Sequence, residues 1–205
     1  KMEKKLFAKR VVEVGYMINE RIEHSLKKSK IMKINDMEYF VHPLCDGCIP
    51  IDIDLLNDAG FSIYTQIVER NLEFPNKVVC IESMGIPIGM SLADYLDAEL
   101  VIIRKRDYIE CFPNQVAVEV DKGYQKDNLY INSIESDDLV FIVDDVIASG
   151  ETLNKVIGAI RYTGAIITGA GAIVEIKGAS EKIDPAIETF ALVNVAIKNG
   201  KVVII

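Results

Sequence analysis

The chain has 205 residues, of which 50% are apolar and 26% charged, and its net charge is −8. These values are typical of one soluble domain with a sizeable core, and an acidic chain of this kind is not expected to bind nucleic acid. No apolar run reaches the roughly 18 residues that span a bilayer, and the first ten residues lack the apolar core of a signal peptide. We therefore expect a cytoplasmic protein without a membrane partner.

The first 75 residues predict two helices with a short strand between them. Apolar residues recur at three- and four-residue steps over residues 3–28, as the buried face of a helix requires. Residues 38–44 predict the strand, and a turn-rich loop follows it. Residues 53–72 predict the second helix, which Gly60 could interrupt.

The loop after the short strand contains a single CxxC, formed by Cys45 and Cys48, with His42 three residues before the first cysteine. A tetrahedral zinc site needs a fourth ligand, which the sequence does not offer. The Asp46-Gly47 centre indicates a turn rather than the start of a redox helix. We therefore predict two incidental thiols in a reducing compartment and no metal site.

Strands and helices alternate over residues 77–176. The alternation predicts an α/β fold, an open and mostly parallel twisted sheet flanked by helices. Asn199-Gly200 predicts a hairpin at the C-terminus. The polar stretch 107–127 lacks a clean period and is long for an idle loop, so it is either a mobile lid or a hairpin. The strands are expected at 77–81, 99–105, 128–132, 139–145 and 166–176, and the helices at 89–98 and 151–164.

Two acids, Asp144 and Asp145, close the apolar run 139–145, and the turn ASGET leads from them into a helix. Ligands of open α/β sheets bind at the carboxyl ends of strands. The unpaired N–H groups at the helix start favour a phosphate, while the two carboxylates suit neutral vicinal hydroxyls or Mg²⁺. A ribose 5-phosphate offers this combination. The structural alternative is an acidic turn that only caps the helix.

The stretch VFIVDDVIASGETL, residues 140–153, resembles the phosphoribosyl pyrophosphate (PRPP) motif of type I phosphoribosyltransferases. The resemblance implies that Asp144 and Asp145 are catalytic and hold the ribose hydroxyls. Glu151 departs from the glycine that is commoner in the family. The resemblance assigns the rest of the PRPP site to Val146, Ile147, Ala148, Ser149, Gly150, Glu151 and Thr152.

Three further segments extend the resemblance, which runs from about residue 30 to residue 177. It implies a pyrophosphate loop within residues 80–89, with a cis peptide near Glu82-Ser83-Met84, and Met84 stands where adenine-specific relatives often have arginine. Residues 107–127 resemble a flexible hood, in which Glu119, Asp121 and Tyr124 are candidate contacts and Asp121 is the catalytic one. The pyrophosphate residues are Glu82, Ser83, Met84, Gly85, Arg104, Lys105 and Arg106.

The resemblance implies a purine phosphoribosyltransferase of purine salvage that converts PRPP and hypoxanthine, guanine or adenine into a nucleotide and pyrophosphate. It also implies Mg²⁺ bound mainly through PRPP and pyrophosphate, a homodimer, and a base site near Lys177. Residues 1–205 form one domain, with helix and hood elements over 1–75, the PRPP-binding core over 76–177 and the hairpin region over 178–205. Two alternatives stay open, a PRPP-binding regulator of the same fold and an enzyme for orotate or another base.

Overall fold

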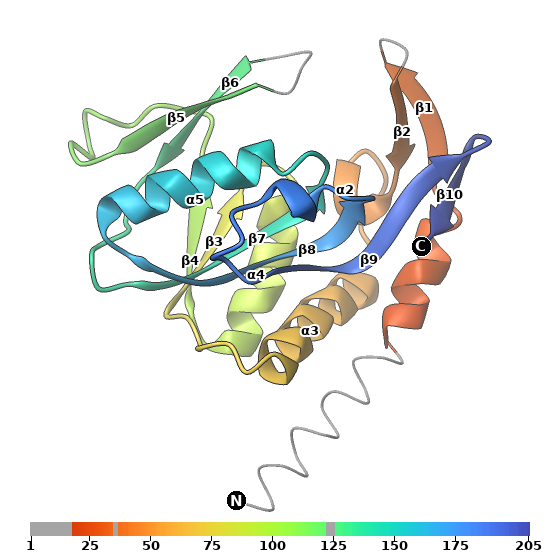
Figure 1. The fold of residues 1–205 in the computed structure, drawn as a ribbon, viewed down its shortest axis with the longest axis horizontal. Coiled ribbons are helices and arrows are strands. Elements are labelled where there is room, and N and C mark those ends of the chain that lie inside the picture. The colour runs from red at the N-terminus through yellow and green to blue at the C-terminus, as the bar shows by residue number, and fades with distance from the viewer. Residues whose placement is uncertain (1–17, 35–36, 122–125) are drawn as a thin grey trace, which may run out of the picture.

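Figure 1 shows the computed structural model of the chain, which describes residues 18–34, 37–121 and 126–205. Its centre is a six-stranded sheet with the order β10-β9-β8-β7-β3-β4. β10 pairs antiparallel with β9, and the other neighbours in this sheet are parallel. The strands are β3 (Lys77–Ile81), β4 (Glu99–Ile103), β7 (Leu139–Ile147), β8 (Ile166–Ile176), β9 (Thr189–Lys198) and β10 (Lys201–Ile204).

Helices cover both faces of the sheet (Figure 1). α3 (Ile53–Glu69) and α4 (Gly85–Leu96) lie on one face, and α5 (Glu151–Thr163) lies on the other. The apolar residues of β7 alternate between the two cores. Phe141 belongs to the cluster that α3 and α4 complete, whereas Ile142 belongs to the cluster that α5 completes. This burial on both faces explains the unbroken apolar run.

Two antiparallel hairpins extend above the sheet in the view of Figure 1. The first consists of β1 (Lys30–Ile34) and β2 (Met37–Val41), and a short helix, α2 (Pro43–Asp46), follows it. The second, which we call the arm, consists of β5 (Val116–Asp121) and β6 (Lys126–Ile131). The stretch 107–127 therefore contains one strand of a hairpin, as one of the two predicted alternatives had it, whereas the prediction missed β1.

Several predicted boundaries were wrong for local reasons. The strand expected at 38–44 ends at Val41, because His42 caps α2 by accepting a hydrogen bond from Leu44 N at 3.3 Å. α3 runs through Gly60 without a break, since the missing side chain there admits Ser91 of α4. α4 begins four residues before the predicted start, at Gly85. β4 ends at Ile103, two residues before the predicted end, and β6 covers 126–131 rather than 128–132.

Other predicted elements agree with the structure. β3 and β8 have the predicted bounds, and Gly164 ends α5 with a left-handed φ of 87°. The Asn199-Gly200 turn has two positive φ values, 52° and 68°, as the predicted hairpin requires. Of the helix predicted over residues 3–28, residues 18–26 are helical, and residues 3–17 lie outside the described part of the chain.

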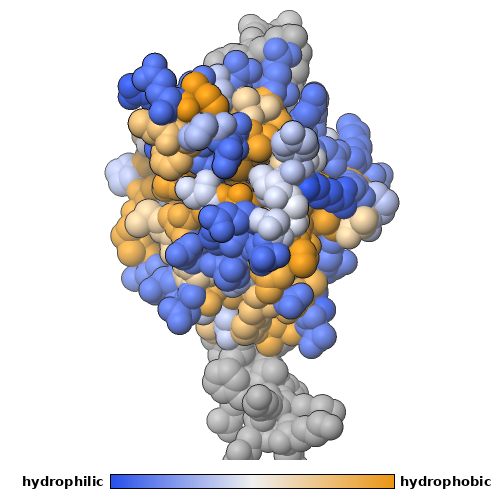
Figure 2. Space-filling model, turned by 90° about the vertical axis from the view of Figure 1, so that its left-hand side faces the viewer, coloured by the Kyte–Doolittle hydropathy of each residue, from blue (hydrophilic) through white to orange (hydrophobic). Residues whose placement is uncertain are grey.

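None of the helices in the described ranges is long and apolar enough to cross a bilayer. Figure 2 shows the side of the molecule at the left of Figure 1, where hydrophilic and hydrophobic side chains are interspersed. An interspersed surface of this kind is ordinary for a folded chain and marks no binding site by itself.

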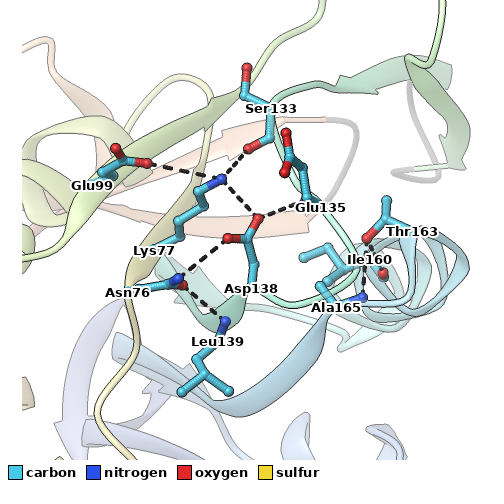
Figure 3. Close-up of polar contacts among 10 residues, drawn as sticks. All are labelled: Asn76, Lys77, Glu99, Ser133, Glu135, Asp138, Leu139, Ile160, Thr163 and Ala165. Atoms are coloured by element: carbon cyan, nitrogen blue, oxygen red, sulfur yellow. Dashed lines mark hydrogen bonds and ion pairs between the residues drawn. The ribbon is translucent and has the colours of Figure 1, made fainter.

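A polar network fixes the starts of β3 and β7 to the turn before β7 (Figure 3). Lys77 Nζ lies 2.8 Å from Asp138 Oδ2 and donates to Ser133 O at 2.9 Å. Asp138 also accepts hydrogen bonds from Glu135 N at 2.7 Å and from Asn76 Nδ2 at 3.4 Å. Burial by itself would raise the pKa of Asp138. The hydrogen bonds and the charge of Lys77 have the larger combined effect, so the pKa of Asp138 is below its usual value. The network therefore holds one end of the arm to the sheet.

Replacing Asp138 by alanine should lower the free energy of unfolding by about 2–4 kcal/mol, because the largely buried Lys77 ammonium would lose its nearer carboxylate and keep only the exposed Glu99 at 3.9 Å. Urea denaturation of the wild type and of Asp138→Ala measures the difference. Asp137→Ala, at the exposed neighbouring position, is the matched control and should stay within about 0.5 kcal/mol of the wild type. Equal losses in the two variants would contradict the assigned role of the network.

Candidate active site

The carboxyl ends of β7, β3 and β4 lie at one edge of the sheet, because these strands are neighbours and parallel. Asp144 and Asp145 belong to β7, residues 82–84 follow β3, and residues 104–106 follow β4. Most of the segments that the sequence singled out are therefore adjacent in space. This edge is where an open α/β sheet binds its ligands.

β7 continues beyond the two acids, so the expectation that the strand ends at them was wrong. Val146 and Ile147 pair with Val174 and Glu175 of β8. Of the residues assigned to the PRPP site, these two therefore lie in the strand, and the turn itself consists of residues 148–150. The longer strand holds the acids more rigidly than a turn would.

The two acids are coupled to each other. Asp144 Oδ1 accepts a hydrogen bond from Asp145 N at 3.0 Å. Burial raises the pKa of the Asp145 carboxyl well above its usual value, and the charge of Asp144 raises it further. A Cβ at Gly85 would lie 2.9 Å from Asp144 Oδ1, so the start of α4 lies directly against this carboxylate.

Residues 148–150 form a tight turn into α5. Ala148 and Ser149 are exposed, and Ser149 Oγ accepts a long hydrogen bond, 3.4 Å, from Glu151 N. Gly150 has a left-handed φ of 77°, and a Cβ there would lie 2.8 Å from Ala179 O. Only glycine fits this position without strain. The turn leaves the first N–H groups of a 13-residue helix facing the edge that carries the acids, which favours an anion there.

The loop after β3 carries the predicted cis peptide, between Glu82 and Ser83. Glu82 Oε2 lies 2.8 Å from Arg104 Nε and accepts a hydrogen bond from Lys105 N at 3.4 Å. The structure thus joins the loop after β3 to the basic segment after β4. The Arg106 guanidinium lies 5.8 Å from the centre of the Tyr108 ring, outside this pair of contacts.

The profile of the family described as "Phosphoribosyl transferase domain" matches residues 59–202. The chain belongs to this phosphoribosyltransferase family. The chain is 36% identical to a protein of Methanotorris igneus named hypoxanthine/guanine phosphoribosyltransferase, over 90% of this chain and 99% of that one. A protein of the same name from Aciduliprofundum boonei is 38% identical, over 88% of this chain and 96% of the relative.

Solved structures agree on the fold. The crystal structure of adenine phosphoribosyltransferase from Thermoanaerobacter pseudethanolicus matches with a TM-score of 0.71 and 19% identity, over 86% of this chain and 99% of that one. The enzyme of the same name from Rhodothermus marinus matches with a TM-score of 0.67 and 22% identity, over 87% and 99%. These matches support the type I phosphoribosyltransferase fold of this chain.

α2 lies beside the acid pair, within the region 1–75 where hood elements were expected. Burial raises the pKa of the Cys45 thiol well above its usual value, and the charges of Asp145, Asp46 and Asp144 raise it further. Cys45 is therefore in a helix beside the phosphoribosyltransferase motif rather than in an open loop. Cys48 is exposed, and both cysteines are free.

His42 fixes α2 in this position. Its Nδ1 accepts a hydrogen bond from Leu44 N, and its Nε2 lies 2.9 Å from Ser25 Oγ, so the neutral ring donates from Nε2. The backbone N–H of His42 in turn donates to Asp46 Oδ2 at 2.8 Å. Burial lowers the pKa of His42 to about 4, which keeps the ring neutral near pH 7.

Glu175 is a residue near the site that the sequence did not single out. It is a buried acid in the apolar strand β8, and its Oε1 accepts hydrogen bonds from Ser180 N at 2.8 Å and Ser180 Oγ at 2.6 Å. These bonds hold the turn that contains Ala179 against Gly150. Glu175 therefore helps to position the turn before α5, through Ser180 and the neighbouring Ala179.

The structure does not bring all the predicted residues into contact with the acids. Lys177 follows the carboxyl end of β8 and is exposed, with its backbone N–H donating to Val195 O. Glu119 is exposed in β5 of the arm, and Asp121 ends that strand. Tyr124 lies outside the described residues. Base-binding and catalytic roles for these residues stay predictions.

Replacing Asp145 by asparagine should stabilise the fold in a pH-dependent way. The pKa of Asp145 is raised in the folded state, while the unfolded chain loses this proton near pH 3.9. The wild type therefore loses stability as the pH rises from about 4 to the pKa of the folded state, by about 1.4 kcal/mol for each pH unit between these two values. Asp145→Asn removes this loss.

Urea denaturation of both proteins at pH values from about 4 to 8 measures this effect. The stability of Asp145→Asn relative to the wild type should increase with pH across this window. A difference that does not change with pH would show that the carboxyl group is not destabilised by ionisation.

Proposed function

We propose that this phosphoribosyltransferase transfers the 5-phosphoribosyl group of PRPP to a purine base and releases pyrophosphate. One observation carries the proposal. A carboxylate pair and the start of α5 lie at the carboxyl end of β7, and a basic segment follows β4, which is separated from β7 only by the parallel strand β3. PRPP presents a diol, a phosphate monoester and a pyrophosphate, which match these three features in chemical character.

Each segment of the site would then bind a different part of PRPP. The turn 148–152 would bind the 5-phosphate through backbone N–H groups and hydroxyls, and Asp144 and Asp145 would accept hydrogen bonds from the ribose hydroxyls. Residues 82–85 and 104–106 would bind the pyrophosphate. This arrangement holds the sugar in place while the C1–O bond breaks and the bond from C1 to the base nitrogen forms.

Charge favours the transition state in this arrangement. The sugar becomes cationic as the C1–O bond breaks, and the two carboxylates lie beside it, while the cations of 104–106 stabilise the departing pyrophosphate. Closure of the arm over the site would exclude water, which would otherwise hydrolyse PRPP. In this proposal Asp121, at the end of β5, would contact the base or the leaving group.

Mg²⁺ is the cation that we propose for the reaction, bound mainly through PRPP and pyrophosphate. The carboxylates of Asp144 and Asp145 are hard oxygen ligands of the kind that Mg²⁺ prefers, and a cation beside them would favour the charged form of Asp145. When bound, Mg²⁺ neutralises charge on the pyrophosphate group.

The identity of the base rests on the relatives. Those at 36–38% identity are named for hypoxanthine and guanine, whereas the adenine phosphoribosyltransferase structures are 22% identical or less and support only the fold. Met84 stands where adenine-specific relatives often have arginine. Its side chain lies against Gly47, the residue that ends α2. We therefore propose hypoxanthine and guanine before adenine. A cytoplasmic location and a homodimer remain part of the proposal.

A PRPP-dependent assay tests the proposed function directly. Purified protein with Mg²⁺ and PRPP should convert hypoxanthine or guanine into the monophosphate, with slower or no conversion of adenine, xanthine, uracil and orotate. Product formation is followed by chromatography, and pyrophosphate release confirms the stoichiometry. Conversion of orotate alone would replace the purine proposal by the pyrimidine alternative, and no conversion of any base would favour a PRPP-binding regulator.

A pair of glycine variants tests the phosphate turn. Gly150→Ala should raise the KM for PRPP by about tenfold or more, because a Cβ would strain the left-handed turn and contact Ala179 O. Gly158→Ala is the matched control in the same helix, where an added Cβ meets nothing within 4 Å. Its KM should equal that of the wild type, and an equal rise in both variants would contradict the role of the turn.

A further inference from the structure

The cations assigned to pyrophosphate already have acidic partners. Arg104 Nε lies 2.8 Å from Glu82 Oε2, and Lys105 Nζ lies 3.5 Å from Asp127 Oδ2. The two acids come from different elements. Glu82 belongs to the loop after β3, whereas Asp127 belongs to β6 of the arm. A pyrophosphate group that uses both cations therefore meets carboxylates from two elements.

The two acids affect their cations differently. Glu82 contacts Arg104 at Nε and accepts a hydrogen bond from the Lys105 backbone N–H, so it holds the segment and leaves the terminal guanidinium nitrogens and the Lys105 ammonium outside these contacts. Asp127 contacts the ammonium itself. Because the ammonium is the group that a phosphate would bind, Asp127 is the direct competitor for Lys105.

The Asp127 side chain is only 9% exposed, while that of Lys105 is 37% exposed. A carboxylate with so little access to water loses stability when a cation beside it leaves, even if other partners stay. Movement of the Lys105 ammonium toward a pyrophosphate would therefore raise the free energy of the arm. That cost counts against pyrophosphate binding.

The arm is also joined to the basic segment through the backbone. Arg104 N donates to Tyr130 O at 3.1 Å, and Tyr130 N donates to Arg104 O at 2.7 Å. Among the described residues, a backbone bridge and an ion pair thus connect β6 to the segment 104–106. Only the ion pair can exchange its partner for an anion while the bridge stays intact.

We propose that Asp127 is a positioning residue that competes with pyrophosphate for Lys105 and so lowers the affinity of the site for this product. This inference rests on the proposed function. With the site empty, Asp127 holds Lys105 and ties the arm to the segment 104–106. With pyrophosphate bound, Lys105 turns to the anion, and the return of Lys105 to Asp127 favours product release.

The variant Asp127→Asn tests the competition, with magnesium pyrophosphate as the probe in isothermal titration calorimetry. Loss of the carboxylate should tighten binding by about two- to fivefold, the range of a partly exposed ion pair. The inhibition constant of pyrophosphate in the steady-state assay should fall by the same factor. A variant that is only damaged would bind more weakly, so the direction of the change separates competition from misfolding.

Three further variants isolate the ion pair. Asp94→Asn makes the same charge change at an exposed position in the last turn of α4 and should bind magnesium pyrophosphate as the wild type does. Asp127→Glu keeps the charge and should also bind with nearly wild-type affinity. In the Lys105→Met background, Asp127→Asn should give no further tightening, because the competing pair is already absent.

The outcomes distinguish this inference from the proposed function. If the wild type binds neither PRPP nor magnesium pyrophosphate, the proposed function fails. If the wild type binds both but Asp127→Asn binds pyrophosphate no more tightly, the competition is overturned and the proposed function stands. Tightening of equal size in the Lys105→Met background would likewise overturn it, because the effect would then not pass through Lys105.

Discussion

Two carboxylates held side by side on a strand buried on both faces set the main constraint on this site. Asp144 and Asp145 are held in place by β8, which pairs with β7 at Asp144 and Val146, while the pairing of β7 with β3 ends just before them at Val143. Burial and mutual repulsion make the doubly charged pair costly, as the raised pKa of Asp145 indicates. The pair lies at the edge of the sheet, where a substrate with hydroxyl donors or a cation could offset the unfavourable free energy of the two charges.

The surroundings of the pair follow from the same constraint. Gly85 allows the start of α4 to approach Asp144, and Gly150 allows the turn before α5 to pack on Ala179. Both approaches direct helix N-termini toward the edge that carries the acids. Positive helix ends therefore surround a negative pair, which is a suitable arrangement for a ligand that has anionic ends and a neutral diol between them.

The sequence predicted the sheet and the motif because both are local signals. The apolar run of β7 and the 3.6-residue period of α5 each depend on neighbouring residues, and the acids and the turn are contiguous. β1 (KIMKI) and β5 (VAVEVD) are short, and each pairs within a hairpin with the strand that follows it. Polar residues lie on either side of β5, and so short a pattern did not stand out from them.

The contacts that organise the site were not predictable for a related reason. Glu82 with Arg104, Lys105 with Asp127, and Cys45 with Asp145 each join segments at least 20 residues apart. A buried acid within the apolar strand β8 was the one available signal for Glu175, since an acid is seldom buried without a partner. Composition and period identify an element, but they do not identify the residue that a long side chain will contact.

The acidic charge of the chain and its proposed anionic substrate are compatible because salt limits the range of electrostatic forces. At physiological ionic strength the Debye length is about 8 Å, so most of the net charge of −8 is screened from an anion at the sheet edge. What the anion meets is the local balance of Arg104, Lys105 and Arg106 against nearby acids. In such a site the acids that pair with the cations matter as much as the cations, because they decide how much positive charge is available before the ligand arrives.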